Sequence, residues 1–174
     1  MTAAPPEPGS RLPLGEVLEF LRLVWEVDHA LQRASKSMGD AFGVTGPQRL
    51  VIRIVGRFPG ILAGQLAETL RIHPSTVSDI VQRLERRGLI QRTRDPRDGR
   101  RILLGLTERG RSVDGERGGT VEGAVKQTLA QLSPSELRGA RSALASLATR
   151  LHASADELST DMRWRTKGHA RVDG

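Results

Sequence analysis

Polar side chains recur at helical spacing over residues 75–86, and their types are those that contact nucleic acid. On a helix that begins at Pro74, one face carries Ser75, Asp79, Gln82 and Arg86, flanked by Ser78 and Arg83, with Thr76 toward the same edge as Arg83. Hydroxyls can meet bases or phosphates, Gln can pair with adenine, and Arg can pair with guanine or phosphate. The opposite face carries Val77, Val81 and Leu84, which can be buried. An ordinary solvated helix face has the same pattern, so this segment alone leaves both interpretations open.

Two residues of the segment, Asp79 and His73, allow alternatives of their own. Asp79 would repel phosphates, but it could accept a hydrogen bond from cytosine N4 or pair with Arg83 four residues later, and the pairing is favoured. His73 could cap the helix or lie near a phosphate, and an exposed turn residue is the favoured interpretation.

The segment "DPRDGR", residues 95–100, predicts a charged turn between two strands at about 90–94 and 101–106. Asp95 and Pro96 favour a type I turn, and Gly99 can supply a positive φ. Asp95 is expected to pair with a neighbouring arginine, while Arg100 and Arg101 brace the hairpin or meet phosphates. Arg97 is then left to project, and a narrow A·T-rich minor groove attracts such a side chain.

The charge of the chain is concentrated in the same region. Of a net charge of +7, residues 71–111 contribute +6, from eleven arginines and five acidic residues. This favours an acidic partner, nucleic acid or a membrane surface. No apolar run approaches the ~20 residues of a membrane span, and residues 1–11 lack the pattern of a signal peptide, so we expect a cytoplasmic protein without a membrane partner.

The residue types exclude several kinds of site. The chain has no cysteine, and its four histidines have no metal-ligand spacing. There is no nucleophile with a nearby base, no pair of carboxylates in a plausible cleft and no phosphate loop. We therefore expect neither an enzyme nor a bound metal or cofactor.

The elements that position these residues are predicted to be mainly helical. Apolar spacing predicts helices from about 14 to 40, from 46 to 57, from 63 to 70 and from 74 to 87, with Thr45 to Gln48 as a capping box and Gly88 as a left-handed end. Thr107 caps a further helix to about residue 132, whose five glycines, at about 1 kcal/mol each, predict a kink, fraying or a close helix contact. Ser133 caps the last helix.

Two short helices followed by a hairpin describe a winged helix. The predicted organisation is a single domain over 13–152, with the winged helix at about 45–106 and flanking helices at about 14–40 and 107–152. Residues 1–12 are expected to be disordered, and residues 153–174 to form a loose extension.

The order of these motifs resembles the MarR family of bacterial transcription regulators. "HPSTVSDIVQRLERRGLIQRTRDPRDGRRILLGLTERG", residues 73–110, resembles that family's recognition helix and wing, including its Asp-x-Arg-x-Gly-Arg motif at Asp95, Arg97, Gly99 and Arg100. "LTERG" and "LSPSEL" resemble the starts of the two following helices. The resemblance spans about residues 14–152.

The resemblance implies a homodimer with a winged helix-turn-helix DNA-binding lobe and a helical dimerisation lobe, bound to a palindromic operator in double-stranded DNA. Arg97 would enter the minor groove, and a small phenolic or anionic effector would relieve repression. The DNA contacts implied are Ser75, Thr76, Ser78, Asp79, Gln82, Arg83, Arg86, Arg94, Asp95, Arg97, Gly99 and Arg100. The family often has Arg where this chain has Asp79, so its operator cannot be carried over. The lack of cysteine excludes the peroxide-sensing mode of some members.

An effector site and a second function remain open from the sequence. Trp25 and His29 lie four residues apart, and with Arg53 they could hold an aromatic acid by stacking and charge. Alternatively, Trp25 belongs to a core or dimer interface, and His29 and Arg53 are surface residues; this interpretation is favoured. The other function is a winged-helix adaptor that binds protein and does not bind DNA specifically.

Overall fold

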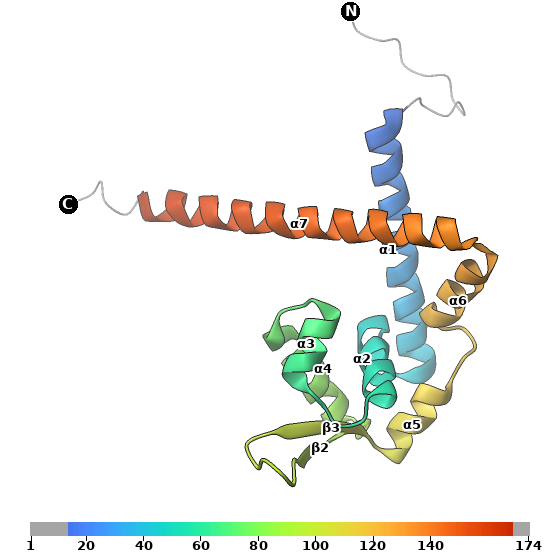
Figure 1. Ribbon diagram of the computed structural model, residues 1–174, viewed down its shortest axis with the longest axis vertical. Helices are drawn as coiled ribbons and strands as arrows, with labels where there is room; N and C mark the ends of the chain where they lie inside the picture. The colour runs from blue at the N-terminus through green and yellow to red at the C-terminus, as the bar shows by residue number, and fades with distance from the viewer. Residues whose placement is uncertain (1–13, 169–174) are drawn as a thin grey trace, which may run out of the picture. The chain divides into compact units, whose positions relative to one another are not determined.

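The computed structural model describes residues 14–168, and Figure 1 shows them as a mainly helical chain with one small sheet. The elements in order are α1 (Gly15–Phe42), α2 (Gly46–Arg57), β1 (Ile61–Leu62), α3 (Ala63–Leu70), α4 (Pro74–Arg86), β2 (Ile90–Arg94), β3 (Ile102–Leu106), α5 (Glu108–Gly115), α6 (Val121–Gln131) and α7 (Pro134–Gly168). This confirms the predicted fold class. The chain divides into two compact units, and the boundary in the sequence falls between Ala124 and Val125. Residues 1–12, predicted to be disordered, lie outside the described residues.

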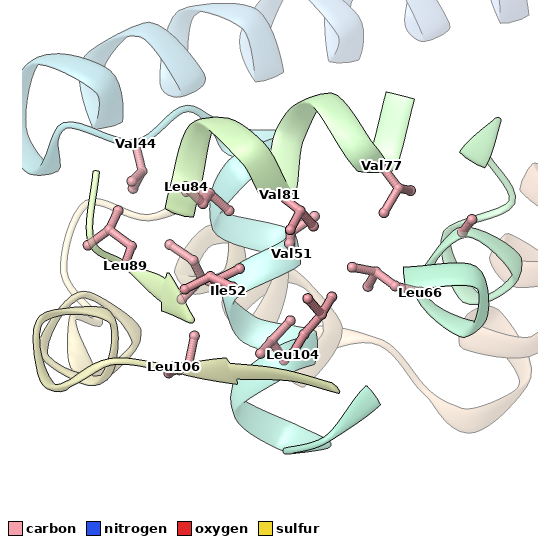
Figure 2. Close-up of a cluster of buried hydrophobic side chains, with 13 residues drawn as sticks. Val44, Val51, Ile52, Leu66, Val77, Val81, Leu84, Leu89, Leu104 and Leu106 are labelled. Atoms are coloured by element: carbon pink, nitrogen blue, oxygen red, sulfur yellow. The ribbon is translucent and has the colours of Figure 1, made fainter. Parts of the chain in front are cut away.

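The core of the first unit joins α4 to α2, α3 and the sheet. Figure 2 shows the buried side chains of this cluster, which are Val44, Val51, Ile52, Val55, Leu66, Ala67, Val77, Val81, Leu84, Leu89, Ile90, Leu104 and Leu106. The three apolar residues predicted for α4 are all fully buried. Because burial of each large aliphatic side chain is worth about 1.5–3 kcal/mol, this cluster fixes which face of α4 is turned away from solvent.

The sheet has the strand order β1-β3-β2, and all its pairs are antiparallel. The predicted hairpin is confirmed, with Ile90 opposite Leu106 and Arg94 opposite Ile102. β1 was not predicted, because two residues are too few to give a periodic signal. It pairs Ile61 with Leu104 and so adds a third strand to the hairpin.

Several predicted helix ends are confirmed. The Gln48 side chain accepts a hydrogen bond from the Thr45 N–H at 3.1 Å. Thr107 Oγ1 accepts one from the Gly110 N–H at 3.0 Å. Gly88 adopts the left-handed conformation, with φ of 66°.

The helix expected from Thr107 to about residue 132 is two helices. α5 ends at Gly115 and α6 begins at Val121, and Gly119 between them has φ of 64°. The Thr120 hydroxyl accepts a hydrogen bond from the Gly123 N–H at 3.1 Å, so it caps a new helix start. The glycines in this stretch lower the free-energy cost of interrupting the helix, because glycine adopts non-helical conformations easily.

The C-terminal helix also differs from the expectation of a loose extension from 153. α7 continues to Gly168. Residues 153–167 contain neither glycine nor proline, so nothing in them ends the helix. Among the described residues, no helix has the length and hydropathy needed to cross a membrane.

Candidate nucleic-acid interface and adjoining cavity

Helix α4 presents the polar face that its sequence predicts. The seven polar residues predicted to face a ligand are all exposed: Ser75, Thr76, Ser78, Asp79, Gln82, Arg83 and Arg86. The burial of Val77, Val81 and Leu84 on the other side leaves no alternative orientation for this helix. The arrangement provides hydroxyl, amide and guanidinium groups on one accessible surface.

His73 caps α4, contrary to the favoured interpretation of a simple turn residue. Its Nδ1 accepts a hydrogen bond from the Ser75 N–H at 3.3 Å and lies 2.7 Å from Ser75 Oγ. The imidazole thus accepts a hydrogen bond from one of the free N–H groups of the first turn. Ser or Asp is more common at this N-cap position.

The predicted ion pair between Asp79 and Arg83 is not formed, as the two side chains do not approach within 4 Å of each other. Both side chains are exposed. An exposed pair gains little once side-chain entropy is counted, so nothing holds the two together. Within the described part of the chain, Arg83 and Arg86 have no acidic partner and are available to a ligand.

The hairpin loop between β2 and β3 is held by its two acids. Asp95 Oδ1 accepts a hydrogen bond from the Arg97 N–H at 2.8 Å, and the Asp95 N–H donates to the Arg101 carbonyl at 3.0 Å. Asp98 Oδ1 accepts from the Arg100 N–H at 3.1 Å, and its Oδ2 lies 3.3 Å from Arg101 Nε. The acids therefore fix the backbone of the loop.

Two predictions for this loop are corrected. The Asp95 side chain accepts a hydrogen bond from one backbone N–H, that of Arg97, and pairs with no arginine side chain that the structure describes; the ion pair belongs to Asp98 and Arg101. Gly99 does not have a positive φ, since the loop reverses over enough residues to need no left-handed position. Arg97 is exposed, and its guanidinium has no acidic partner among the described residues.

An ion pair that sequence reasoning missed joins the hairpin to α4. Arg92 Nε of β2 lies 3.0 Å from Glu85 Oε2 of α4, and both side chains are about 40% exposed. The two residues are not at a helical or strand spacing, so no local signal could have shown it. The contact fixes the base of the hairpin against the helix that carries the polar face.

Comparison with known proteins identifies the family. The MarR family model matches residues 42–101, which run from the end of α1 to the end of the hairpin loop. The HTH-type transcriptional regulator TtmR of Methylorubrum extorquens is 31% identical over 135 residues, which cover 76% of this chain and 67% of the relative. This chain belongs to the MarR family. It is therefore a transcription regulator and not an enzyme.

Solved structures agree with this MarR assignment. The S. aureus MepR–DNA complex has a TM-score of 0.62 at 23% identity, over 75% of this chain and 96% of MepR, and so shares the fold. PcaV of Streptomyces coelicolor, solved with its natural ligand, has a TM-score of 0.58 at 26% identity, over 80% of this chain and 96% of PcaV.

The structure does not bring the three predicted effector residues of this MarR protein together. Trp25 and His29 line an open concavity along α1, with Arg22, Glu26, Asp28, Ala30 and Arg33. Arg53 does not line it. Instead Arg53 Nη1 lies 2.7 Å from Asp114 Oδ1, and its Nε lies 3.6 Å from Glu122 Oε1. The interpretation of Arg53 as a surface residue holds only in part, because its side chain is 35% exposed and α5 and the start of α6 supply acids beside it.

Sequence reasoning also missed Arg49, whose side chain is 1% exposed. Its Nε donates to both Glu122 oxygens, at 2.8 and 3.1 Å, and its Nη1 donates to the Val113 carbonyl at 2.7 Å. Its Nη2 donates to the Glu116 carbonyl. One signal was available: Arg49 precedes the buried Ile52 by three residues and so shares its face of α2.

A cavity of about 380 Å³ adjoins this network. It lies among α1, α2, the end of α3, the α3–α4 turn, α4 and the start of α6. Its lining residues are Leu31, Ser35, Gly46, Pro47, Leu50, Leu70, Ile72, Ile80, Val121 and Glu122. The family resemblance led us to expect a pocket between the helices at 14–40, 46–57 and 107–132, but its lining residues were not predicted, because they come from segments up to 91 positions apart in the chain.

Proposed function

We propose that this MarR protein is a dimeric, sequence-specific DNA-binding repressor, and that a small molecule in the cavity releases it from DNA. The observation that carries the proposal is the exposed polar face of α4 beside a hairpin whose Arg97 guanidinium is unpaired. The relative MepR, which shares the fold, is described as a complex with DNA.

The proposed DNA contacts divide between the two grooves. Helix α4 enters the major groove, where Gln82, Arg83 and Arg86 reach base edges or phosphates and Ser75, Thr76, Ser78 and Asp79 complete the contact surface. Arg97 enters the flanking minor groove. Asp95 and Gly99 shape the loop that presents it, and Arg94 and Arg100 neutralise phosphates.

Dimerisation is supported by the exposed apolar residues of α1. Large apolar side chains between 43% and 79% exposed follow this helix: Val17, Leu18, Phe20, Leu21, Leu23, Trp25, Val27 and Leu31. A contiguous apolar surface of this kind usually marks an interface, and a second copy would cover it. Trp25 then belongs to the dimer interface. Two copies place their α4 helices on half-sites about 34–36 Å apart.

Release by a small molecule is supported by the composition of the cavity wall. Ile80 lies on α4, so a molecule in the cavity contacts the same helix that carries the DNA face. The wall also includes residues of α1, whose apolar surface is the proposed dimer interface. A ligand between α1 and α4 can therefore change the distance between the two α4 helices of the dimer. This weakens binding to DNA, whose two half-sites have a fixed spacing.

The test is a fluorescence anisotropy titration with the duplex upstream of the protein's own gene and with a scrambled duplex. The protein should bind the upstream duplex at least ~10³-fold more tightly than the scrambled duplex. Arg97→Ala should weaken binding to the upstream duplex about tenfold and reduce the salt slope by about 1. Arg22→Ala, which removes an exposed arginine of α1, is the matched control and should leave both unchanged.

Other outcomes would support different conclusions. Equal binding to both duplexes at low salt would favour the protein-binding adaptor. An unchanged affinity of Arg97→Ala would remove the minor-groove assignment. A monomer by light scattering would refute the dimer, and lower expression of a reporter when the gene is deleted would refute repression.

A further inference from the structure

Beyond the presence of an effector cavity, the charges around it determine what kind of molecule it accepts. We infer that the cavity selects a neutral, apolar ligand and rejects aromatic acids; this rests on the proposed function, since it concerns the effector of the same regulator. It excludes the anionic effector that the family resemblance allows and keeps the neutral phenolic one.

The wall of the cavity offers an anion no counter-charge. Among the described residues that line it, eight are apolar or glycine, and the two others are Ser35 and Glu122. The lining therefore contains a carboxylate and no Lys, Arg or His. An anion transferred into such a site loses its hydration without gaining a partner, and it approaches a like charge.

The two nearest arginines of α2 cannot supply the missing charge. Arg49 is buried, and its guanidinium donates hydrogen bonds to Glu122 and to the carbonyls of Val113 and Glu116. Arg53 pairs with Asp114. Two arginines and two acids thus balance each other, and none of the four except Glu122 lines the cavity.

A cationic ligand is not favoured either. It would have to share Glu122 with Arg49, whose Nε already contacts both carboxylate oxygens, at 2.8 and 3.1 Å. Ser35 Oγ accepts a hydrogen bond from the Gly46 N–H at 2.8 Å, which leaves its hydroxyl as a neutral polar group in the wall. The remaining surface suits an apolar molecule with at most one or two hydrogen-bonding groups, and about 380 Å³ is at the small end of ligand sites.

A pair of fluorescent probes tests the inference: anilinonaphthalene, which is neutral, and anilinonaphthalene sulfonate, which adds one negatively charged sulfonate group to the same rings. The full chain should bind the neutral probe at least tenfold more tightly. The neutral probe should also weaken binding to the protein's own DNA site, measured by anisotropy, whereas the sulfonate should not.

Variants of one lining residue separate charge from other effects. Leu50 is 46% exposed, so a longer polar side chain can keep contact with solvent there. Leu50→Lys should raise the affinity for the sulfonate at least tenfold and lower it for the neutral probe. Leu50→Gln adds polarity without charge and should give no gain for the sulfonate. Phe58→Lys, on an exposed apolar residue at the end of α2 and outside the cavity, should change neither affinity.

The inference is overturned if the sulfonate binds as tightly as the neutral probe, or if the neutral probe does not bind to a protein that does bind DNA. It is also overturned if Phe58→Lys reproduces the effect of Leu50→Lys, because the probes then report the outer surface. Failure of the protein to bind DNA without any probe would count against the proposed function, and the ratio of the two probe affinities would still be measured.

Discussion

Replacing Arg49 by Met measures how strongly α2 is fixed to the segment that joins α5 to α6. Arg49 is 1% exposed, and its guanidinium contacts Glu122 and the carbonyls of Val113 and Glu116. Methionine has a similar length and is apolar, so the packing of the side-chain stem is kept while the ion pair and the donors are lost.

The expected loss in the free energy of unfolding is about 3 kcal/mol. Breaking a fully buried ion pair costs about 3–5 kcal/mol. Here the partner left behind, Glu122, is 35% exposed and can regain water, which moves the value toward the lower end. The two carbonyls that lose a donor add to the cost, at about 1–3 kcal/mol for each one that stays unsatisfied.

Equilibrium urea denaturation followed by far-UV circular dichroism measures this change. The protein concentration must be the same for every variant, because the stability of the proposed dimer would depend on it. In a thermal scan the same change corresponds to a decrease in Tm of roughly 6–12 °C. Arg22→Met is the control, since it removes an exposed arginine that contacts Glu19 and Glu26 within α1, and only a small change is expected. If Arg49→Met lowers the free energy of unfolding by less than about 1 kcal/mol, the Arg49–Glu122 pair contributes no more than an exposed ion pair, and the reasoning from burial is wrong.

Three further changes test other parts of the structure. Gly110→Ala puts a methyl group against the carbonyl oxygen of Leu89, closer than the atoms allow, and should cost about 1–3 kcal/mol in urea denaturation; an unchanged midpoint would show that α5 does not pack there. Thr107→Ala removes the N-cap of α5 and should cost about 1 kcal/mol by the same measurement, whereas Thr107→Ser should restore most of it. Hydrogen bonds from the Ser133 hydroxyl and N–H hold the pKa of Glu136 below its usual 4.5, so this contribution to stability is present above that pH and is lost as the pH falls through the lowered pKa. Ser133→Ala should move the pKa of Glu136 up toward 4.5 in an NMR titration, and an unmoved pKa would exclude the hydroxyl as its cause.

Features that depend on nearby residues were predictable from the sequence. The alternation of apolar and polar residues in 74–86 determined which face of α4 is buried, because a helix turns by a constant angle at each residue. Thr45, Gly88 and Thr107 marked helix ends correctly, since caps act over three or four positions. The Asp-x-Arg-x-Gly-Arg motif correctly predicted that Arg97 lies in an exposed loop, because a turn also depends on residues that are close in the sequence.

Features that need distant residues were decided by the tertiary structure alone. From the sequence alone, Arg49 is one more arginine on an amphipathic helix. Its partner Glu122 lies 73 positions later, and only the fold brings the two side chains together. The fold also pairs Arg53 with Asp114, away from the predicted effector site. It forms a cavity in which Glu122 is the one charged residue among the described residues of the wall. Local periodicity determines which side of a helix is buried, but it carries no information about which charges that side will meet. The exposed polar face of α4 in this MarR protein could therefore be predicted from its sequence, whereas the charge of the cavity wall beside it could not.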